Sequence, residues 1–138
     1  MISKATIYNI ARFFFPAWAI AIVAVSLTPG AGIESLSFGD QSFRIDYPLH
    51  ATAFFILPVS AWMAYGYTKR ALRHPGYRKA VLLSLILAIA SEFLQIPVPG
   101  RAFNVMDIVS NLLGVGGGVA AVSVFTRLWQ VGNTGQGR

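Results

Sequence analysis

Four long apolar stretches separated by short polar segments dominate the chain. They cover residues 10–27, 48–67, 80–96 and 105–128. Each approaches the ~20 residues that an α-helix needs to cross the hydrocarbon core of a bilayer. None alternates strictly between apolar and polar residues, and backbone groups in lipid must be hydrogen-bonded within their own segment, so helices are favoured. The pattern predicts an all-α fold, an integral membrane bundle of four transmembrane helices.

Prolines mark helix boundaries and kinks in this pattern. Pro48 opens the second stretch, where the start of a helix tolerates proline, and Pro97 and Pro99 follow the third. Pro16 and Pro58 fall inside the first and second stretches, so a kink is predicted in each helix.

The first stretch also has features of a secretory signal peptide. Lys4 and Arg12 precede or flank its apolar run, and Ala24, Val25 and Ser26 loosely resemble a cleavage site. Cleavage would leave three helices without inverting them. Both interpretations of this stretch stay open at this point.

Length and composition fit one domain with a lipid-facing surface. The 138 residues allow a single domain, 1–138, with its core at 10–128 and a flexible tail at 129–138. The chain is 55% hydrophobic and 12% charged, against a usual charged share of about 25%. A water-soluble domain of this size would need more charge to cover its surface. The chain has no cysteine, which excludes disulfides and thiolate ligands.

The basic residues predict an orientation. The net charge is +6, from 11 basic and 5 acidic residues, and nine of the 11 lie near the N-terminus, between the second and third stretches, or near the C-terminus. Only Arg44 and Arg101 lie in the other two loops. The positive-inside rule therefore predicts a multi-pass protein of the cytoplasmic membrane with both termini cytoplasmic. Because the basic residues lie between apolar runs, they are expected to contact anionic headgroups and no nucleic acid.

All five acidic residues belong to the predicted outer half of the molecule. Glu34, Asp40 and Asp46 lie in the first outer loop, Glu92 lies near the end of the third stretch, and Asp107 lies near the start of the fourth. Ionisable groups inside a membrane are costly and therefore indicate function.

Further polar side chains gather at the same depth. Glu92 and Gln95 are spaced i, i+3 and share one helix face, and Asp107 and Asn111 are spaced i, i+4 on the next helix. The predicted outer-face pocket comprises His50, Glu92, Gln95, Arg101, Asp107 and Asn111. The alternative is a purely structural network in which Glu92, Arg101 and Asp107 satisfy one another and lock the bundle.

Small residues indicate where these helices approach one another. Ser84, Ala88 and Ser91 form a track that leads to the polar end of the third helix, and Gly114 and Gly118 form a small-xxx-small pair on the fourth. The glycine run that ends at Gly118 lacks phosphate-loop spacing, so it is interpreted as a packing feature.

Two sequence blocks carry a family resemblance. The first is Ser-Leu-Thr-Pro-Gly at 26–30 with Asp-Tyr-Pro-Leu-His at 46–50. The second is Glu-Phe-Leu-Gln at 92–95 and Pro-Gly-Arg at 99–101, followed by Asp107, Asn111 and Gly114. On these residues the chain resembles the VanZ-like family of small membrane proteins, whose founding member is associated with low-level teicoplanin resistance. The resemblance implies a helical membrane fold and a cell-envelope setting, without defining a reaction.

The chain departs from the family pattern at two positions. Tyr47 stands where the family usually has lysine, and Phe54 stands where it often has tyrosine. The first change removes a cation and the second a hydroxyl. No role for either group is carried over to this chain.

The leading functional hypothesis is a cell-envelope protein that binds an anionic outer-leaflet lipid or a lipid-linked cell-wall precursor. Arg101 would hold a phosphate or carboxylate with its planar guanidinium. Gln95 and Asn111 would orient the ligand through neutral hydrogen bonds, and Asp46 is a further candidate ligand-binding residue.

An enzymatic version of this hypothesis is a membrane-surface hydrolase or transferase. His50 with Glu92 or Asp107 would form its proton-transfer pair. No recognised nucleophile motif is present, and His74 lies in the inner loop, which excludes a two-histidine phosphatase site. No cofactor is expected, although a divalent cation held by His50, Glu92 and Asp107 is chemically plausible.

Two further classes of function remain as alternatives. One is an accessory subunit that scaffolds envelope enzymes without catalysis. The other is a small transporter, for which four short helices leave little room unless copies of the chain form a homo-oligomer.

Overall fold

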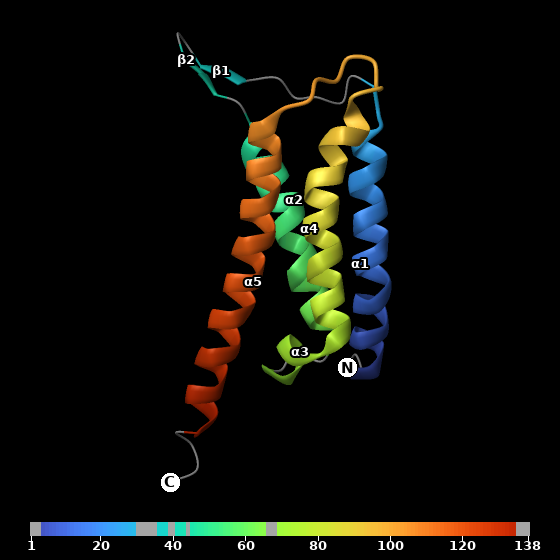
Figure 1. The fold of residues 1–138 in the computed structure, drawn as a ribbon. Coiled ribbons are helices and arrows are strands. Elements are labelled where there is room, and N and C mark those ends of the chain that lie inside the picture. The colour runs from blue at the N-terminus through green and yellow to red at the C-terminus, as the bar shows by residue number, and fades with distance from the viewer. Residues whose placement is uncertain (1–3, 30–35, 39–40, 44, 66–68, 135–138) are drawn as a thin grey trace.

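The computed structural model describes residues 4–29, 36–38, 41–43, 45–65 and 69–134 (Figure 1). These residues form five helices and one pair of short strands. In chain order the elements are α1 (Lys4–Ser26), β1 (Leu36–Phe38), β2 (Gln41–Phe43), α2 (Asp46–Ala64), α3 (Lys69–Arg73), α4 (Pro75–Gln95) and α5 (Val105–Thr134). The helical fold predicted from the apolar stretches is confirmed.

The four long helices, α1, α2, α4 and α5, lie side by side and alternate in direction along the chain (Figure 1). The start of α1, the end of α5 and the short helix α3 lie at one end of this bundle. The β1–β2 hairpin and the connection between α4 and α5 lie at the other, which we call the hairpin end. Helix α2 contacts each of the other three long helices and packs most extensively on α5.

Local chemistry explains where the helices begin. Pro48 lies in the first turn of α2 and Pro75 is the first residue of α4, and in a first turn the missing N–H of proline costs nothing. His74 precedes α4, and its Nδ1 accepts a hydrogen bond from the backbone N–H of Gly76 at 3.0 Å. This cap allows α4 to start before residue 80, where the apolar pattern begins. Helices α1 and α2 continue through their internal prolines, Pro16 and Pro58.

Two elements differ from the sequence prediction. Leu36 pairs with Phe43 and Phe38 with Gln41 in an antiparallel hairpin, within a segment predicted to be a loop. Helix α5 continues to Thr134, beyond residue 128 where its apolar stretch ends. The part of the predicted flexible tail that lies before residue 135 is therefore helical.

Two glycines allow α5 to approach α2 closely. A Cβ atom on Gly114 would overlap the carbonyl oxygen of Ala51, and one on Gly118 would lie 2.5 Å from Cγ of Pro58. Gly116, between them, faces open space. The backbones of α2 and α5 therefore meet along the predicted small-xxx-small pair. Below the hairpin end, the contact is filled by a buried apolar cluster of Phe54, Leu57, Ala88 and Val115.

The distribution of polarity is typical of a protein surrounded by lipid. Large apolar side chains such as Phe13, Ile20, Leu113 and Leu128 are more than half exposed. Polar side chains are buried instead, among them Ser60, Ser84, Ser91, Glu92, Gln95, Asp107 and Asn111. An apolar exterior around polar groups is unfavourable in water and favourable in hydrocarbon.

Two of the described helices are long and apolar enough to cross a membrane. They contain the segments Asn9–Ser26 in α1 and Val105–Trp129 in α5, with mean hydropathy of 1.6 and 1.8. Within the described residues, α2 and α4 do not meet the same criterion. They carry polar groups of the hairpin end, including His50 on α2 and Glu92 on α4.

Candidate functional site

Three helices bring ionisable side chains together at the hairpin end. His50 lies in the second turn of α2, Glu92 in the last turn of α4, and Asp107 in the first turn of α5. One potential ligand atom from each of these residues lies within 4.8 Å of the other two. Residues separated by up to 57 positions in sequence thus meet at one depth, as the sequence predicts. We call these three residues the buried triad after its two buried carboxylates, although the side chain of His50 is 24% exposed.

A buried amide fixes the orientation of His50. The side chain of Asn111 is completely buried, and its Nδ2 donates hydrogen bonds to the carbonyl oxygen of Ala88 at 3.1 Å and to Oγ of Ser91 at 3.4 Å. Its Oδ1, which can only accept, lies 2.9 Å from Nδ1 of His50. Nδ1 is therefore the protonated nitrogen, and Nε2 faces Oδ2 of Asp107 at 3.9 Å.

Amide side chains also hold the two carboxylates. Nε2 of Gln95 donates to Oε1 of Glu92 at 3.1 Å, and Nδ2 of Asn104 donates to Oδ1 of Asp107 at 3.1 Å. Asn104 also accepts a hydrogen bond from the backbone N–H of Met106 at 3.0 Å, so it is the N-cap of α5. The sequence prediction did not include Asn104. Its place just before an apolar helix, three residues before Asp107, is the signal that identifies it.

Glu92 retains one oxygen without a partner. Its side chain is 0% exposed, and within the described residues Oε2 has no hydrogen-bond partner. The closed structural network considered above, in which Glu92, Arg101 and Asp107 satisfy one another, is therefore not formed at this oxygen. A buried acceptor without a partner is rare in folded proteins and indicates a ligand or strain.

Arg101 binds helix α1. It follows Gly100, whose φ of 76° lies in the left-handed region that glycine adopts readily, at a turn in the middle of the α4–α5 connection. Nη2 of Arg101 donates to the carbonyl oxygen of Val25, in the last turn of α1, at 2.7 Å. Nε of the same guanidinium is buried without a hydrogen-bond partner among the described residues.

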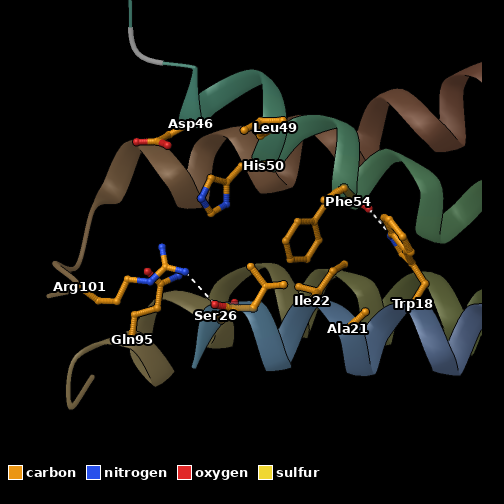
Figure 2. Close-up of a pocket in the computed structure, with 12 residues that line it drawn as sticks. Trp18, Ala21, Ile22, Ser26, Asp46, Leu49, His50, Phe54, Gln95 and Arg101 are labelled. Carbon is orange, nitrogen blue, oxygen red and sulfur yellow. Dashed lines mark hydrogen bonds between the residues drawn. The ribbon is translucent and has the colours of Figure 1, made fainter. Parts of the chain in front are cut away.

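A cavity of about 330 Å³ lies between α1, α2 and Arg101 (Figure 2). Its polar end carries Asp46, His50, Gln95 and Arg101. The wall away from that end is apolar. It is formed by Trp18, Ala21, Ile22, Leu49, Ala53 and Phe54. We call this space the amphipathic cavity.

The structure thus divides the predicted site into two adjoining parts. Arg101, Gln95 and Asp46 line the amphipathic cavity. Glu92, Asp107 and Asn111 do not line it, and each contacts a residue that does: Glu92 contacts Gln95, and the other two face His50. His50 belongs to both parts. Glu34, Asp40 and Arg44, which were assigned to the outer loop, lie outside the described residues.

Comparison with known proteins tests the family resemblance. Neither a search of curated proteins nor a search of solved structures finds a match to the chain. The model of the VanZ/LLP1 family, however, matches residues 5–126, which include both blocks that carry the resemblance and all the residues of the site. The chain is therefore a membrane protein of the VanZ/LLP1 family.

Proposed function

We propose that α1, α2, α4 and α5 each cross the cytoplasmic membrane, with both termini in the cytoplasm. The alternating direction of the helices supports this topology (Figure 1). So does the distribution of charge, because Arg70, Arg73, Arg78 and Lys79 lie in or beside α3, at the end opposite to the hairpin. The hairpin end, with the amphipathic cavity, would then lie on the outer face.

We further propose that the amphipathic cavity binds an anionic lipid or a lipid-linked cell-wall precursor. The observation that carries this proposal is the pairing of a guanidinium with an apolar wall in one cavity. A lipid has the same division, because its charged headgroup adjoins an acyl or prenyl chain. The cavity has the size of a small-molecule site, for which about 300–1,000 Å³ is usual.

Arg101 is the residue that would bind the anionic group. A guanidinium has five N–H donors, and the contact with Val25 uses one of them. The N–H groups that remain match the oxygen atoms of a phosphate or carboxylate. Asp46 at the same end supplies an acceptor, which favours a headgroup that also carries O–H or N–H donors.

A binding experiment tests this proposal. Purified protein would be titrated with vesicles of phosphatidylglycerol, with a polyprenyl phosphate, and with phosphatidylcholine as the zwitterionic control. Hydrogen bonds to charged groups contribute about 1.5–3 kcal/mol, so Arg101→Ala should weaken binding of the anionic lipids roughly 10- to 100-fold. Arg127→Ala is the matched control, since Arg127 is an exposed residue of α5 that does not line the cavity.

A second variant separates the role of the charge from that of the cavity. Ile22→Trp would fill part of the apolar wall and leave Arg101 in place. It should also weaken binding of both anionic lipids. Wild-type affinity in Arg101→Ala and Ile22→Trp together would overturn the lipid-binding proposal. Binding of the polyprenyl phosphate alone would identify the precursor rather than the phospholipid as the ligand.

Modification of the lipid and a contribution to glycopeptide resistance extend this proposal. His50 lines the cavity, so it is placed to exchange a proton with a bound headgroup. Expression of the chain in a teicoplanin-sensitive host, with the Arg101→Ala variant as control, tests the contribution to resistance. Equal resistance in the two strains would show that resistance does not depend on Arg101, and it would favour a scaffolding role.

A further inference from the structure

We propose that the buried triad binds a divalent transition-metal cation. His50, Glu92 and Asp107 come from α2, α4 and α5, and one ligand atom from each lies within 4.8 Å of the other two. A metal ion bound there would link three of the four long helices. This inference does not depend on lipid binding in the amphipathic cavity.

The partnerless oxygen of Glu92 is the second observation that points to a ligand. Glu92 is 0% exposed, and Oε2 has no hydrogen-bond partner among the described residues. An ionised carboxylate in a buried site is stable only when it is paired, hydrogen-bonded or bound to a metal, and otherwise it takes up a proton. Gln95 donates to Oε1 and the backbone N–H of Asn104 also interacts with this carboxylate, so Oε2 is the oxygen that makes no hydrogen bond of normal geometry.

The charges in the triad favour an ion with two positive charges. Glu92 and Asp107 place two carboxylates side by side in a region from which water is largely excluded. With the neutral imidazole of His50, the ionised triad would carry a charge of −2. A divalent cation brings that charge to zero, whereas a single proton would leave half of it.

The distance between His50 and Asp107 fits a shared ion better than a direct hydrogen bond. Because Nδ1 donates to Asn111, the neutral imidazole would present the lone pair of Nε2 to Asp107. Nε2 and Oδ2 are 3.9 Å apart, beyond hydrogen-bond distance, and both atoms are acceptors. Two ligands that each lie about 2.0–2.2 Å from a tetrahedral ion are about 3.3–3.6 Å apart, so Nε2 and Oδ2 would approach each other by a few tenths of an ångström on binding it.

The surroundings of the triad resemble the surroundings of metal ligands in general. A histidine that binds a metal usually donates its other N–H to an acceptor, and ligating carboxylates are themselves hydrogen-bonded. Here three amides have these roles. The pairs are Asn111 with His50, Gln95 with Glu92, and Asn104 with Asp107.

The composition of the triad selects the class of ion. One imidazole with two carboxylates suits Zn²⁺ and Mn²⁺, whereas Mg²⁺ and Ca²⁺ prefer oxygen ligands alone. Three protein ligands also leave at least one coordination position for water or a ligand. Because His50 also lines the amphipathic cavity, the ion would lie beside that cavity.

The test is metal binding by the full chain. Protein purified in detergent would be stripped with a chelator, dialysed against Zn²⁺ or Mn²⁺, and analysed for metal content and by titration calorimetry. About one equivalent per chain is expected for the wild type. Glu92→Gln and Asp107→Asn preserve side-chain volume, and each should lower the affinity by at least about tenfold. A wild type that retains neither metal overturns the proposal.

Control variants separate this site from its surroundings. His74→Gln changes a histidine in front of α4, at the opposite end of the bundle, and should keep the full metal content. Arg101→Ala removes the proposed lipid anchor but no metal ligand, so it should also bind one equivalent. Normal metal content with lost lipid binding, or the reverse, would therefore show which of the two proposals has failed.

A spectroscopic signature identifies the ligand itself. Mn²⁺ bound through Nε2 of His50 should show nitrogen couplings in pulsed electron paramagnetic resonance. His50→Gln should abolish these couplings, while His74→Gln should leave them unchanged. Couplings that persist in His50→Gln would contradict the assignment of His50 as a ligand.

Discussion

The side chain of Asn111 on α5 holds the imidazole of His50 on α2, with 2.9 Å between Oδ1 and Nδ1. The same amide donates to Ala88 and Ser91 on α4. One buried residue therefore fixes both the tautomer of His50 and the relative positions of three helices. This dual role explains why a neutral amide occupies the centre of the hairpin end.

We expect Asn111→Ala to destabilise the protein by about 1–3 kcal/mol, because it removes three hydrogen bonds and leaves Nδ1 of His50 without its acceptor. Thermal unfolding in detergent measures this loss. Asn9→Ala is the matched control, since Asn9 is exposed on α1 and should change stability little. Equal stability of the two variants would contradict a central role for the amide.

We also expect Asn111→Ala to weaken metal binding, although the three ligand residues remain in place. The freed imidazole could rotate or change tautomer, so we expect a loss of roughly 10- to 100-fold in affinity for Mn²⁺ or Zn²⁺. Calorimetry on folded Asn111→Ala measures it. An unchanged affinity would mean that the orientation of His50 does not depend on Asn111.

Substitutions of the glycines on α5 should show how much of the stability depends on close helix packing and how much on helix propensity. Gly114→Ala would push a methyl group into the carbonyl oxygen of Ala51, and Gly118→Ala would crowd Pro58 and Phe55. We expect each to cost about 1–3 kcal/mol. Gly116→Ala is the control, because nothing lies within 4 Å of its added Cβ. Alanine favours the helix by up to about 1 kcal/mol, so this variant should be neutral or more stable.

The absence of cysteine from the chain makes the proposed topology simple to test. Single cysteines would be introduced as Thr28→Cys after α1 and as Arg70→Cys in α3, both at exposed positions. A membrane-impermeant maleimide should label Thr28→Cys in intact cells. It should label Arg70→Cys only after the membrane is opened. The reverse pattern would invert the orientation, and labelling of both in intact cells would exclude an odd number of crossings between them.

Much of the fold follows from the sequence because apolar length and turn residues act locally. The four apolar stretches predict the four long helices, and Gly114 and Gly118 predict the contact between α2 and α5. The β1–β2 hairpin was missed, since its two three-residue strands are too short to show alternation. The early start of α4 was missed because the cap by His74 depends on a side-chain hydrogen bond.

The meeting of the site residues was also predictable, while their partners were not. Helical spacing and common depth predict that His50, Glu92 and Asp107 converge. Which groups share a hydrogen bond depends on rotamers and on how the helices are rotated about their axes. For that reason the contact of Arg101 with Val25 and the division of the site between the triad and the cavity, with His50 in both, appear only in three dimensions.

His50 is the one residue of the buried triad that also lines the amphipathic cavity. Any occupant of the cavity that shifts or protonates the imidazole must alter the free energy of an ion bound to the triad. By thermodynamic reciprocity, the ion changes the affinity of the occupant by the same factor. Under the two proposals, the shared imidazole would couple the two compartments, and the supply of metal would then influence how strongly the amphipathic cavity holds a lipid.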